Sequence, residues 1–230
     1  ADGTAVVGGL DQIGGGGEPC MVEHLESLDA LIVLRDDGVY QIDPRTLAGE
    51  LVEFPLDALT PVHHVKSLPK GEKIADAARA KRLRLEGAAL VAGQQLGLAE
   101  GALDLANEYA KGREQFGRTI GSFQAVKHML AEMFVRQEAA RAGAYNAGAT
   151  LDAPEVADVE RAVSAAKITA GEAAIRNGRS CIQVPGGMGF TWEVLAHYYF
   201  KRAWVLENLF GTQEEHAEKI ADLLTAQVKA

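Results

Sequence analysis

The sequence lacks the features that mark several classes of protein. Its 230 residues carry a formal net charge of −9, and so acidic a chain has little of the basic surface that nucleic-acid binding requires. No apolar run approaches the roughly 20 residues of a membrane helix, and no signal-peptide pattern opens the chain. We therefore expect no nucleic-acid partner and no membrane span, and we predict a cytoplasmic protein.

Cysteine is also scarce. Cys20 and Cys181 are the only two, and their separation fits neither a metal site nor a disulfide framework. The six histidines show no zinc-like spacing, so no metal is expected. Cys181 lies among apolar residues, which predicts a buried free thiol. The chain opens with Ala1 in place of Met, which leaves open a processed chain or a truncated fragment.

The residues that are present change character near residue 75. Before it, short apolar runs are broken by Gly, Pro and Asp. Residues 28–34 and 39–42 predict a β-hairpin around Asp37 and Gly38, and residues 51–55 and 62–65 are candidates for further short strands. The first 20 residues contain seven glycines and are expected to form a loop or an interrupted strand.

From about residue 74 the sequence predicts helices. Apolar residues recur at steps of three and four, a helical rhythm, at Leu85, Ala89, Ala92, Leu96, Ala99, Leu103 and Ala106. Further helices are expected from Ser122, from Asp152, from about Thr191 to Phe210, and over 213–228, with Ser122 and Asp152 as capping residues. Short connections favour antiparallel neighbours. The predicted fold is α+β, mostly α: a partial β-rich domain at 1–75 and an up-and-down helical bundle at 76–230.

Two segments differ from ordinary helical sequence. The first, residues 113–117 (Arg-Glu-Gln-Phe-Gly), places a guanidinium and an aromatic ring at a corner between helices, where they suit a phosphate or a planar ligand. The second, residues 182–190, contains the turn Pro-Gly-Gly-Met-Gly, whose bare backbone can approach a ligand. Taken alone, the glycine-rich turn is more typical of plain turn chemistry than of a binding site.

Together and in this order, the two segments resemble the carboxy-terminal domain of the acyl-CoA dehydrogenase family. That family shows an Arg-x-x-Phe-Gly corner, a Gln-x-x-Gly-Gly-x-Gly turn and a long helix that ends in a Gly-Thr step, here Gly211-Thr212. The resemblance covers residues 77–228 clearly and 25–75 weakly. Family members have an amino-terminal helical domain and a complete β-domain in addition.

The resemblance implies a flavoprotein oxidoreductase of lipid metabolism that oxidises an acyl-CoA thioester to the trans-2-enoyl form. It implies FAD shared across the subunit interface of a homo- or hetero-oligomer, a dimer of dimers, with electron-transfer flavoprotein or a similar protein as acceptor. The residues that match its positions in contact with the FAD of the neighbouring subunit are Arg113, Phe116 and Gln124. Gln183, Gly186 and Gly187 match the turn at the adenosine end of that FAD, and Thr212 matches a residue near the flavin's own diphosphate.

The sequence departs from the family at the catalytic base. The family's usual Glu precedes the Gly-Thr step, where this chain has Phe210, which cannot accept a proton. Some members place the Glu on the first bundle helix, at the position of Gly87. Glu86 is adjacent, but a step of one residue turns a helix by about 100°, so Glu86 is a weak candidate. Glu207 fits a solvated or salt-bridged helix face better than a base.

Two functions remain open from the sequence. The first is a subunit or fragment of a FAD-dependent acyl-CoA dehydrogenase without its own base, resembling the non-catalytic partner in heteromeric actinobacterial enzymes. The second is a structural or interaction module, derived from that family, that binds no flavin. A basic stretch at 66–84 is either a solvated helix start or an anion-facing edge. The aromatic segment 192–204, with His197, fits a core or an interface better than a pocket wall.

Overall fold

The computed structural model describes residues 3–15 and 18–229, and it divides the chain into two compact units, Ala1–Glu86 and Gly87–Ala230. The boundary falls inside helix α1 (Ala77–Gly112), which both units share. The fold is α+β and mostly helical, as predicted. The division at residue 75 stays a prediction. No helix in the described part of the chain is long and apolar enough to cross a membrane.

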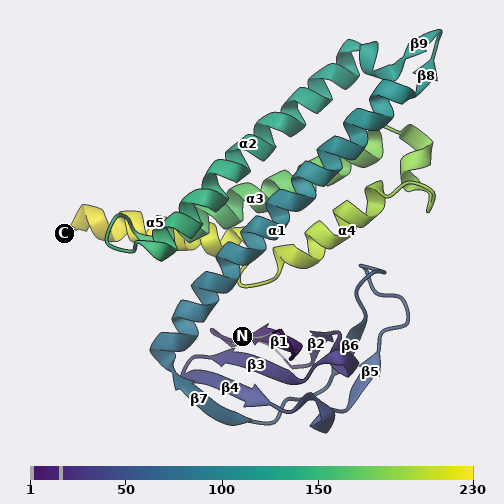
Figure 1. The fold of residues 1–230 in the computed structure, drawn as a ribbon. Coiled ribbons are helices and arrows are strands. Elements are labelled where there is room, and N and C mark those ends of the chain that lie inside the picture. The colour runs from purple at the N-terminus through teal and green to yellow at the C-terminus, as the bar shows by residue number, and fades with distance from the viewer. Residues whose placement is uncertain (1–2, 16–17, 230) are drawn as a thin grey trace. The chain divides into compact units, whose positions relative to one another are not determined.

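The first unit is built from two small sheets (Figure 1). One has the order β1-β3-β4-β7, and the other has the order β2-β6-β5. The predicted hairpin is confirmed as β3 (Ala30–Arg35) and β4 (Gly38–Ile42). The two strands are antiparallel, and Arg35 pairs with Gly38 next to the turn. The other strands are β1 (Val7–Asp11), β2 (Cys20–Glu23), β5 (Gly49–Leu51), β6 (Val62–Val65) and β7 (Glu72–Asp76), with 3-10 turns at Leu25–Ser27 and Pro44–Thr46.

Pairing between strands explains where the sequence-based boundaries in this unit were wrong. Residues 74–76 belong to β7, which pairs with β4, so helix α1 begins at Ala77 and not at Ile74. The carboxylate of Asp76 caps it by accepting a hydrogen bond from the Arg79 amide at 2.9 Å. In the glycine-rich start, β1 pairs in parallel with β3. Gly8 suits this position, because a side chain there would collide with Leu28.

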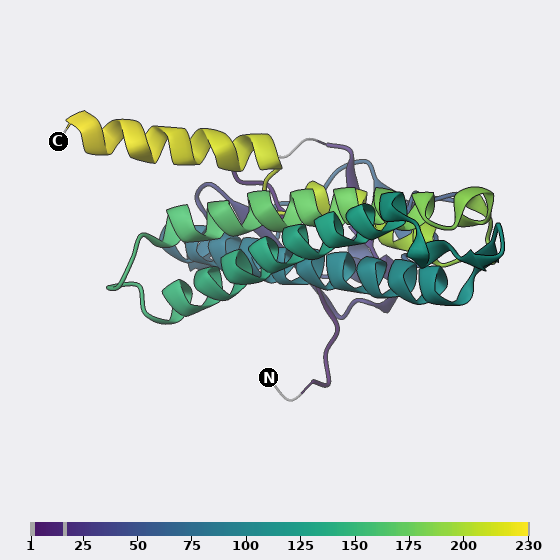
Figure 2. The ribbon, with the colours of Figure 1, turned by 90° about the horizontal axis from the view of Figure 1, so that it is seen from above.

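The second unit is the predicted up-and-down bundle. Helices α1, α2 (Gln124–Asp152) and α3 (Val159–Gln183) run side by side in Figures 1 and 2, followed by α4 (Ala196–Glu207) and α5 (Gln213–Lys229). A two-stranded hairpin, β8 (Glu114–Gln115) and β9 (Arg118–Thr119), connects α1 to α2 through a 3-10 turn at Ile120–Ser122. A second 3-10 turn, Gly186–Phe190, follows α3.

Small buried residues let the three long helices approach closely. Alanines at 92, 99, 102, 106 and 110 of α1 are at most 1% exposed. The amide of Asn177 on α3 donates to the carbonyls of Ala99 (3.2 Å) and Met133 (3.0 Å), and its oxygen accepts from Arg136 at 3.0 Å. One buried side chain thus connects α1, α2 and α3, and its hydrogen bonds fix the positions of the three helices relative to one another along the bundle axis.

Three predicted helix ends in the bundle were wrong. Ser122 does not cap α2, because its hydroxyl donates to the Thr119 carbonyl instead. Asp152 is the last residue of α2, and Asp158 is the cap of α3, accepting from the Arg161 amide at 3.0 Å. Helix α4 ends at Glu207 and not at Phe210, because Phe210 and Gly211 adopt positive φ values of 56° and 102°, which a right-handed helix cannot contain.

Candidate functional site

The corner between α1 and α2 is a tight hairpin that exposes an aromatic ring. Gln115 pairs with Arg118, so the loop is Phe116-Gly117, with φ values of 54° and 77°. Two left-handed residues are what a type I′ turn requires, but a phenylalanine rarely takes that conformation. The residue is 91% exposed, and its ring lies at 90° to that of Phe123, with 6.2 Å between the centroids. The corner therefore presents a largely uncovered ring.

Arg113 stands at the base of this hairpin and is exposed. Its backbone is fixed, because its amide donates to the Tyr109 carbonyl (2.9 Å) and its carbonyl accepts from the Ile120 amide (2.8 Å). Its guanidinium has no hydrogen-bond or ion-pair partner among the described residues. Gln124, the first residue of α2, is exposed as well. A fixed backbone with an unengaged cation suits a ligand phosphate.

The turn after α3 has an open backbone. Gly186 has a φ of 63°, and a Cβ added at Gly186 or at Gly187 would meet no atom within 4 Å. Gly189 has a different role. A Cβ added there would collide with the Ile182 carbonyl, so this glycine allows the turn to pack closely against the end of α3. Gln183, the last residue of α3, is exposed. The first two glycines thus leave room for another molecule to approach the main chain.

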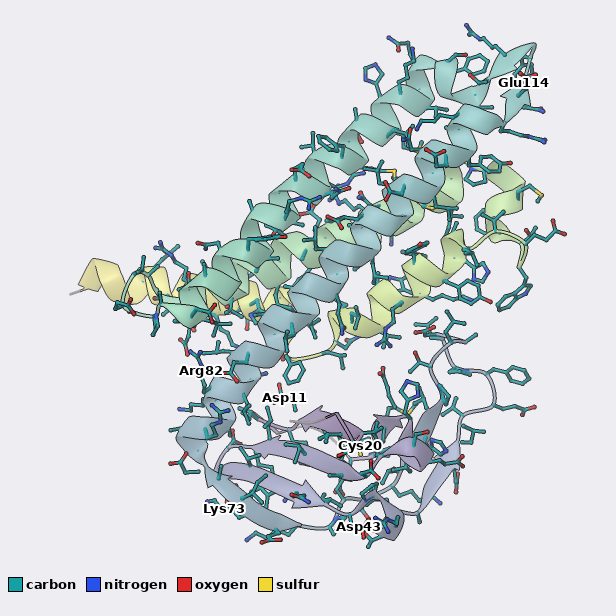
Figure 3. All side chains as sticks on the ribbon, in the orientation of Figure 1. Asp11, Cys20, Asp43, Lys73, Arg82 and Glu114 are labelled. Carbon is teal, nitrogen blue, oxygen red and sulfur yellow. The ribbon has the colours of Figure 1, made fainter. Side chains whose placement is uncertain are left out.

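The hairpin corner and the glycine turn lie at the same end of the bundle. A single buried cluster includes Ala110 of α1, Cys181 and Val184 beside the turn, and Ile120 and Val126 beside the corner. Figure 1 shows the β8–β9 hairpin where α1 ends and the turn where α3 ends, and Figure 3 marks Glu114 at that hairpin. Six of the seven predicted cofactor-binding residues are therefore at one end.

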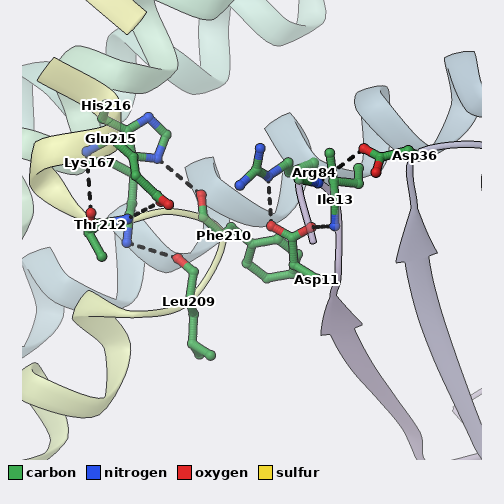
Figure 4. A network of polar contacts seen from close by, with 11 residues as sticks. Asp11, Ile13, Asp36, Arg84, Lys167, Leu209, Phe210, Thr212, Glu215 and His216 are labelled. Carbon is green, nitrogen blue, oxygen red and sulfur yellow. Dashed lines mark hydrogen bonds and ion pairs between the residues drawn. The ribbon is translucent and has the colours of Figure 1, made fainter. Parts of the chain in front are cut away.

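Thr212, the seventh, lies at the other end of α4, where α5 begins. Its hydroxyl accepts from the Glu215 amide at 3.2 Å, and the Glu215 carboxylate accepts from the Thr212 amide at 2.9 Å (Figure 4). This reciprocal pair is a capping box. Thr212 thus has a structural role at the start of α5, and its predicted role near a flavin diphosphate stays a prediction.

The two positions that the resemblance assigns to a catalytic carboxylate lie against each other. A Cβ at Gly87 would be 2.6–2.8 Å from three ring atoms of Phe210, so the ring covers the Gly87 backbone. Glu86 is engaged elsewhere: its carboxylate accepts from Arg82 Nε at 2.7 Å and lies 3.9 Å from Arg79. Glu207 accepts from the Gln213 amide at 2.8 Å. These contacts favour structural roles for both glutamates.

We expect Gly87→Ala to disturb this packing. A methyl group at Gly87 must displace the Phe210 ring, and overpacking of this kind costs about 1–3 kcal/mol. Alanine in a helix interior otherwise gains up to about 1 kcal/mol over glycine. Gly93→Ala on the same helix is the control, because a Cβ there meets nothing within 4 Å. In urea unfolding, Gly93→Ala should stabilise the chain and Gly87→Ala should not. Equal stabilisation would contradict the close packing.

Sequence reasoning missed two buried polar residues behind Phe210. Lys167 of α3 is 0% exposed, and its ammonium donates to the carbonyls of Leu206 and Leu209. His216 of α5 is 1% exposed and contacts the Phe210 carbonyl and the Ser164 hydroxyl. A signal existed for Lys167, because it lies beside the apolar positions Val163, Ala166 and Ala170, where a helix faces the core.

Burial lowers the pKa of Lys167 from 10.5 to about 8, although Glu207 and Glu215 oppose the shift. Between those two values the unfolded chain holds a proton that the folded chain has lost, so stability should rise with pH. From pH 8 to 10 the expected gain is about 2 kcal/mol. Urea unfolding of the wild type and of Lys167→Met would measure it, with Lys127→Met, an exposed lysine of α2, as control. The same rise in Lys167→Met would contradict the assignment.

Other candidate groups in the sequence do not form a site. The Cys181 thiol is buried, and burial raises its pKa to about 12, so it is not a nucleophile. His197 lies between the rings of Trp192 and Tyr198, and burial lowers its pKa, helped by Lys201. In the basic stretch, Arg84 pairs with Asp11 at 2.6 Å (Figure 4). Among the described residues no group of three or more His, Cys, Asp or Glu could hold a metal.

The chain is similar to known proteins over most of its length. The family profile described as acyl-CoA dehydrogenase, C-terminal domain, matches residues 79–225. Acyl-CoA dehydrogenase FadE34 of Mycobacterium tuberculosis is 36% identical over 206 residues, which are 86% of this chain and 28% of that protein. Acyl-CoA dehydrogenase IpdE2 of the same species is 45% identical over 128 residues, 56% of this chain and 38% of that protein.

Among solved structures, the ChsE4–ChsE5 complex from Mycobacterium tuberculosis superimposes with a TM-score of 0.81. The match covers 96% of this chain and 66% of that chain at 23% identity, and it concerns the fold. The chain therefore has the fold of larger proteins and spans only 28% and 38% of the two curated relatives.

Proposed function

The chain belongs to the acyl-CoA dehydrogenase family through its C-terminal domain, and from that membership we propose that it is the flavin-sharing part of a subunit without a catalytic carboxylate of its own. The whole protein would take part in the α,β-dehydrogenation of an acyl-CoA thioester in the cytoplasm. Residues 1–75 would be part of its middle domain and residues 76–230 its helical domain.

One observation carries this proposal: the exposed hairpin corner and the open glycine turn lie at one end of the bundle. The group they would serve is FAD, and the residues fit it. Arg113 offers an unengaged guanidinium for a diphosphate, Phe116 offers an uncovered ring for a planar group, and Gly186 and Gly187 leave the main chain accessible. These groups face solvent, which suits a cofactor held jointly with another subunit.

Each residue would have a limited chemical task. Arg113 and Gln124 would hold the cofactor's polar groups, and Phe116 would cover it from water. FAD, when bound, would supply the acceptor for the hydride that leaves the β carbon of the acyl chain. The α proton requires a carboxylate, and Phe210 provides none, so a subunit of another kind would contribute it. The two kinds of subunit would form a hetero-oligomer, a dimer of dimers, and electrons would pass on to electron-transfer flavoprotein or a similar acceptor.

The packing of Phe210 on Gly87 supports the absence of a base. At both positions where a carboxylate is expected from the family pattern, the chain lacks an ionisable side chain, and the Phe210 ring occupies the space that a side chain at Gly87 would need. Glu86, the remaining candidate, is paired with Arg82. A base from Glu86 would require this pair to break first.

The test is purification of the full-length protein with its natural partners, followed by a flavin absorption spectrum and subunit masses. We expect a yellow complex of two kinds of subunit. A yellow complex of one kind of subunit would support the shared FAD and contradict a carboxylate from the partner. A colourless complex that also fails to bind added FAD would overturn the proposal and would favour a structural or interaction module without flavin. The masses would show in addition whether the 230 residues are part of a longer chain.

A further inference from the structure

We propose that Lys167 and His216 are positioning residues: they grip, by hydrogen bonds, the backbone of Leu209 and Phe210. We call this fixed backbone conformation at position 210 the socket. It directs the side chain at position 210 toward Gly87, whichever residue stands there. The inference rests on the proposed function in one respect, namely that position 210 is where a base would act. The socket itself is argued from contacts within the helical unit alone.

Lys167 holds the end of α4. Its ammonium donates to the Leu206 carbonyl at 3.2 Å and to the Leu209 carbonyl at 3.0 Å. These carbonyls lie at the C-terminal end of the helix, where a positive charge is favourable. Breaking either bond would leave a further donor of a buried ammonium unpaired, which is costly, so both carbonyls are held in place.

His216 holds the next residue. Its Nε2 lies 3.0 Å from the Phe210 carbonyl (Figure 4). Its Nδ1 lies 3.0 Å from the Ser164 hydroxyl. A carbonyl only accepts, so Nε2 carries a proton. In the neutral ring Nδ1 then accepts, and the Ser164 hydroxyl donates to it. Ser164 thus fixes the ring orientation, and the ring fixes the Phe210 carbonyl.

Both grips involve side chains on one face of α3: Lys167 acts directly, and Ser164 acts through His216 of α5. Ser164 and Lys167 are three residues apart on α3, so their side chains share a face. Beyond the turn, the Glu215 carboxylate accepts from the Thr212 amide at 2.9 Å, and the Glu207 carboxylate accepts from the Gln213 amide at 2.8 Å. Backbone groups on both sides of Phe210 and Gly211 are therefore held by side chains of α3, α4 and α5.

The Phe210 side chain takes no part in this grip. Every bond just described from the side chains of Lys167, His216, Glu207 and Glu215 to residues 206–213 involves a backbone group of that segment, while the ring lies on Gly87. The left-handed backbone of Phe210, with φ of 56°, determines the direction of its Cα–Cβ bond. A different side chain at this position would leave the same buried bonds in place and would point the same way. The identity of residue 210 can therefore change without changing its direction.

A probe at position 210 tests the inference without reference to catalysis. The full chain would carry 4-fluorophenylalanine at Phe210, and its ¹⁹F spectrum would be compared between wild type, Lys167→Met and Ser164→Ala. We expect one resonance in the wild type, separate from that of the urea-unfolded chain. It should move or broaden in both variants at unchanged helicity. Lys127→Met, which removes an exposed lysine of α2, should leave it in place.

A resonance that stays in place in a folded Lys167→Met or Ser164→Ala chain would overturn the inference for that residue's grip. If Lys167→Met does not fold, Ser164→Ala decides alone, because it removes one hydroxyl and keeps the helix. Flavin content is measured on the same samples. Absent flavin in the wild type would count against the proposed function and not against the socket, whereas an unmoved resonance would count against the socket at any flavin content.

Discussion

Replacing Phe210 with glutamate is expected to give the chain a working base. The backbone at position 210 is held by Lys167 and His216, so the carboxylate should take the direction of the present ring, over Gly87. It would accept the α proton of a bound acyl-CoA as the C–H bond breaks. A positioned general base contributes about a hundredfold to ten-thousandfold in rate. Acyl-CoA-dependent bleaching of the flavin, followed anaerobically in the intact complex, should gain an additional phase.

The matched control is Phe210→Gln, which has the same size and shape as the glutamate but almost no basicity. It should show no additional phase while the flavin content stays that of the wild type. Identical bleaching in Phe210→Glu and Phe210→Gln would show that this chain lacks more than a base, for example room for the thioester. The same comparison therefore separates a missing carboxylate from a missing pocket.

The second large effect is expected for Arg113→Ala. A hydrogen bond between charged groups contributes about 1.5–3 kcal/mol, so loss of the guanidinium should weaken FAD retention by about ten- to a hundredfold. The helices should be unaffected, because the bonds of Arg113 to Tyr109 and Ile120 use only its backbone. Flavin released on dilution of the complex, together with circular dichroism, would measure both.

Arg176→Ala is the control for this charge change. Arg176 is an exposed arginine of α3 whose partner is Glu172, one turn away on the same helix. Its removal lowers the net charge equally, but away from the corner. If both variants retain FAD as the wild type does, Arg113 does not contact the diphosphate. If both lose it equally, the effect belongs to overall charge and not to the corner.

Periodicity alone predicted the fold class and most of the helices. The apolar runs at 28–34 and 39–42 on either side of Asp37 and Gly38 predicted a hairpin, and the alanine stripe of α1 predicted a buried helix face, since both patterns are local. The strands β1 and β7 were missed or misread, because each forms only through pairing with a distant strand. The start of α3 was misplaced because Asp152 and Asp158 are equally plausible caps until the preceding helix is known to run on.

Less of the candidate site than of the fold could be predicted from the sequence. Arg113, Phe116 and the glycine turn differed from ordinary helical sequence by their residue types, but only a family resemblance related them to FAD. Their common end follows from antiparallel helices. The packing of Phe210 on Gly87, 123 positions apart in the chain, could not be deduced from spacing. Nor could the grip of Lys167 and His216, because it brings together α3, the end of α4 and α5.

The hairpin tip shows how folding and binding make opposite demands on one residue. Phe116 adopts a left-handed backbone and leaves its ring in water. Glycine at that position would remove the steric cost, about 1 kcal/mol, and would also remove an apolar surface that water solvates poorly. A chain optimised only for thermal stability would therefore lose the ring, and under the proposed function such a heat-resistant variant would hold FAD less well.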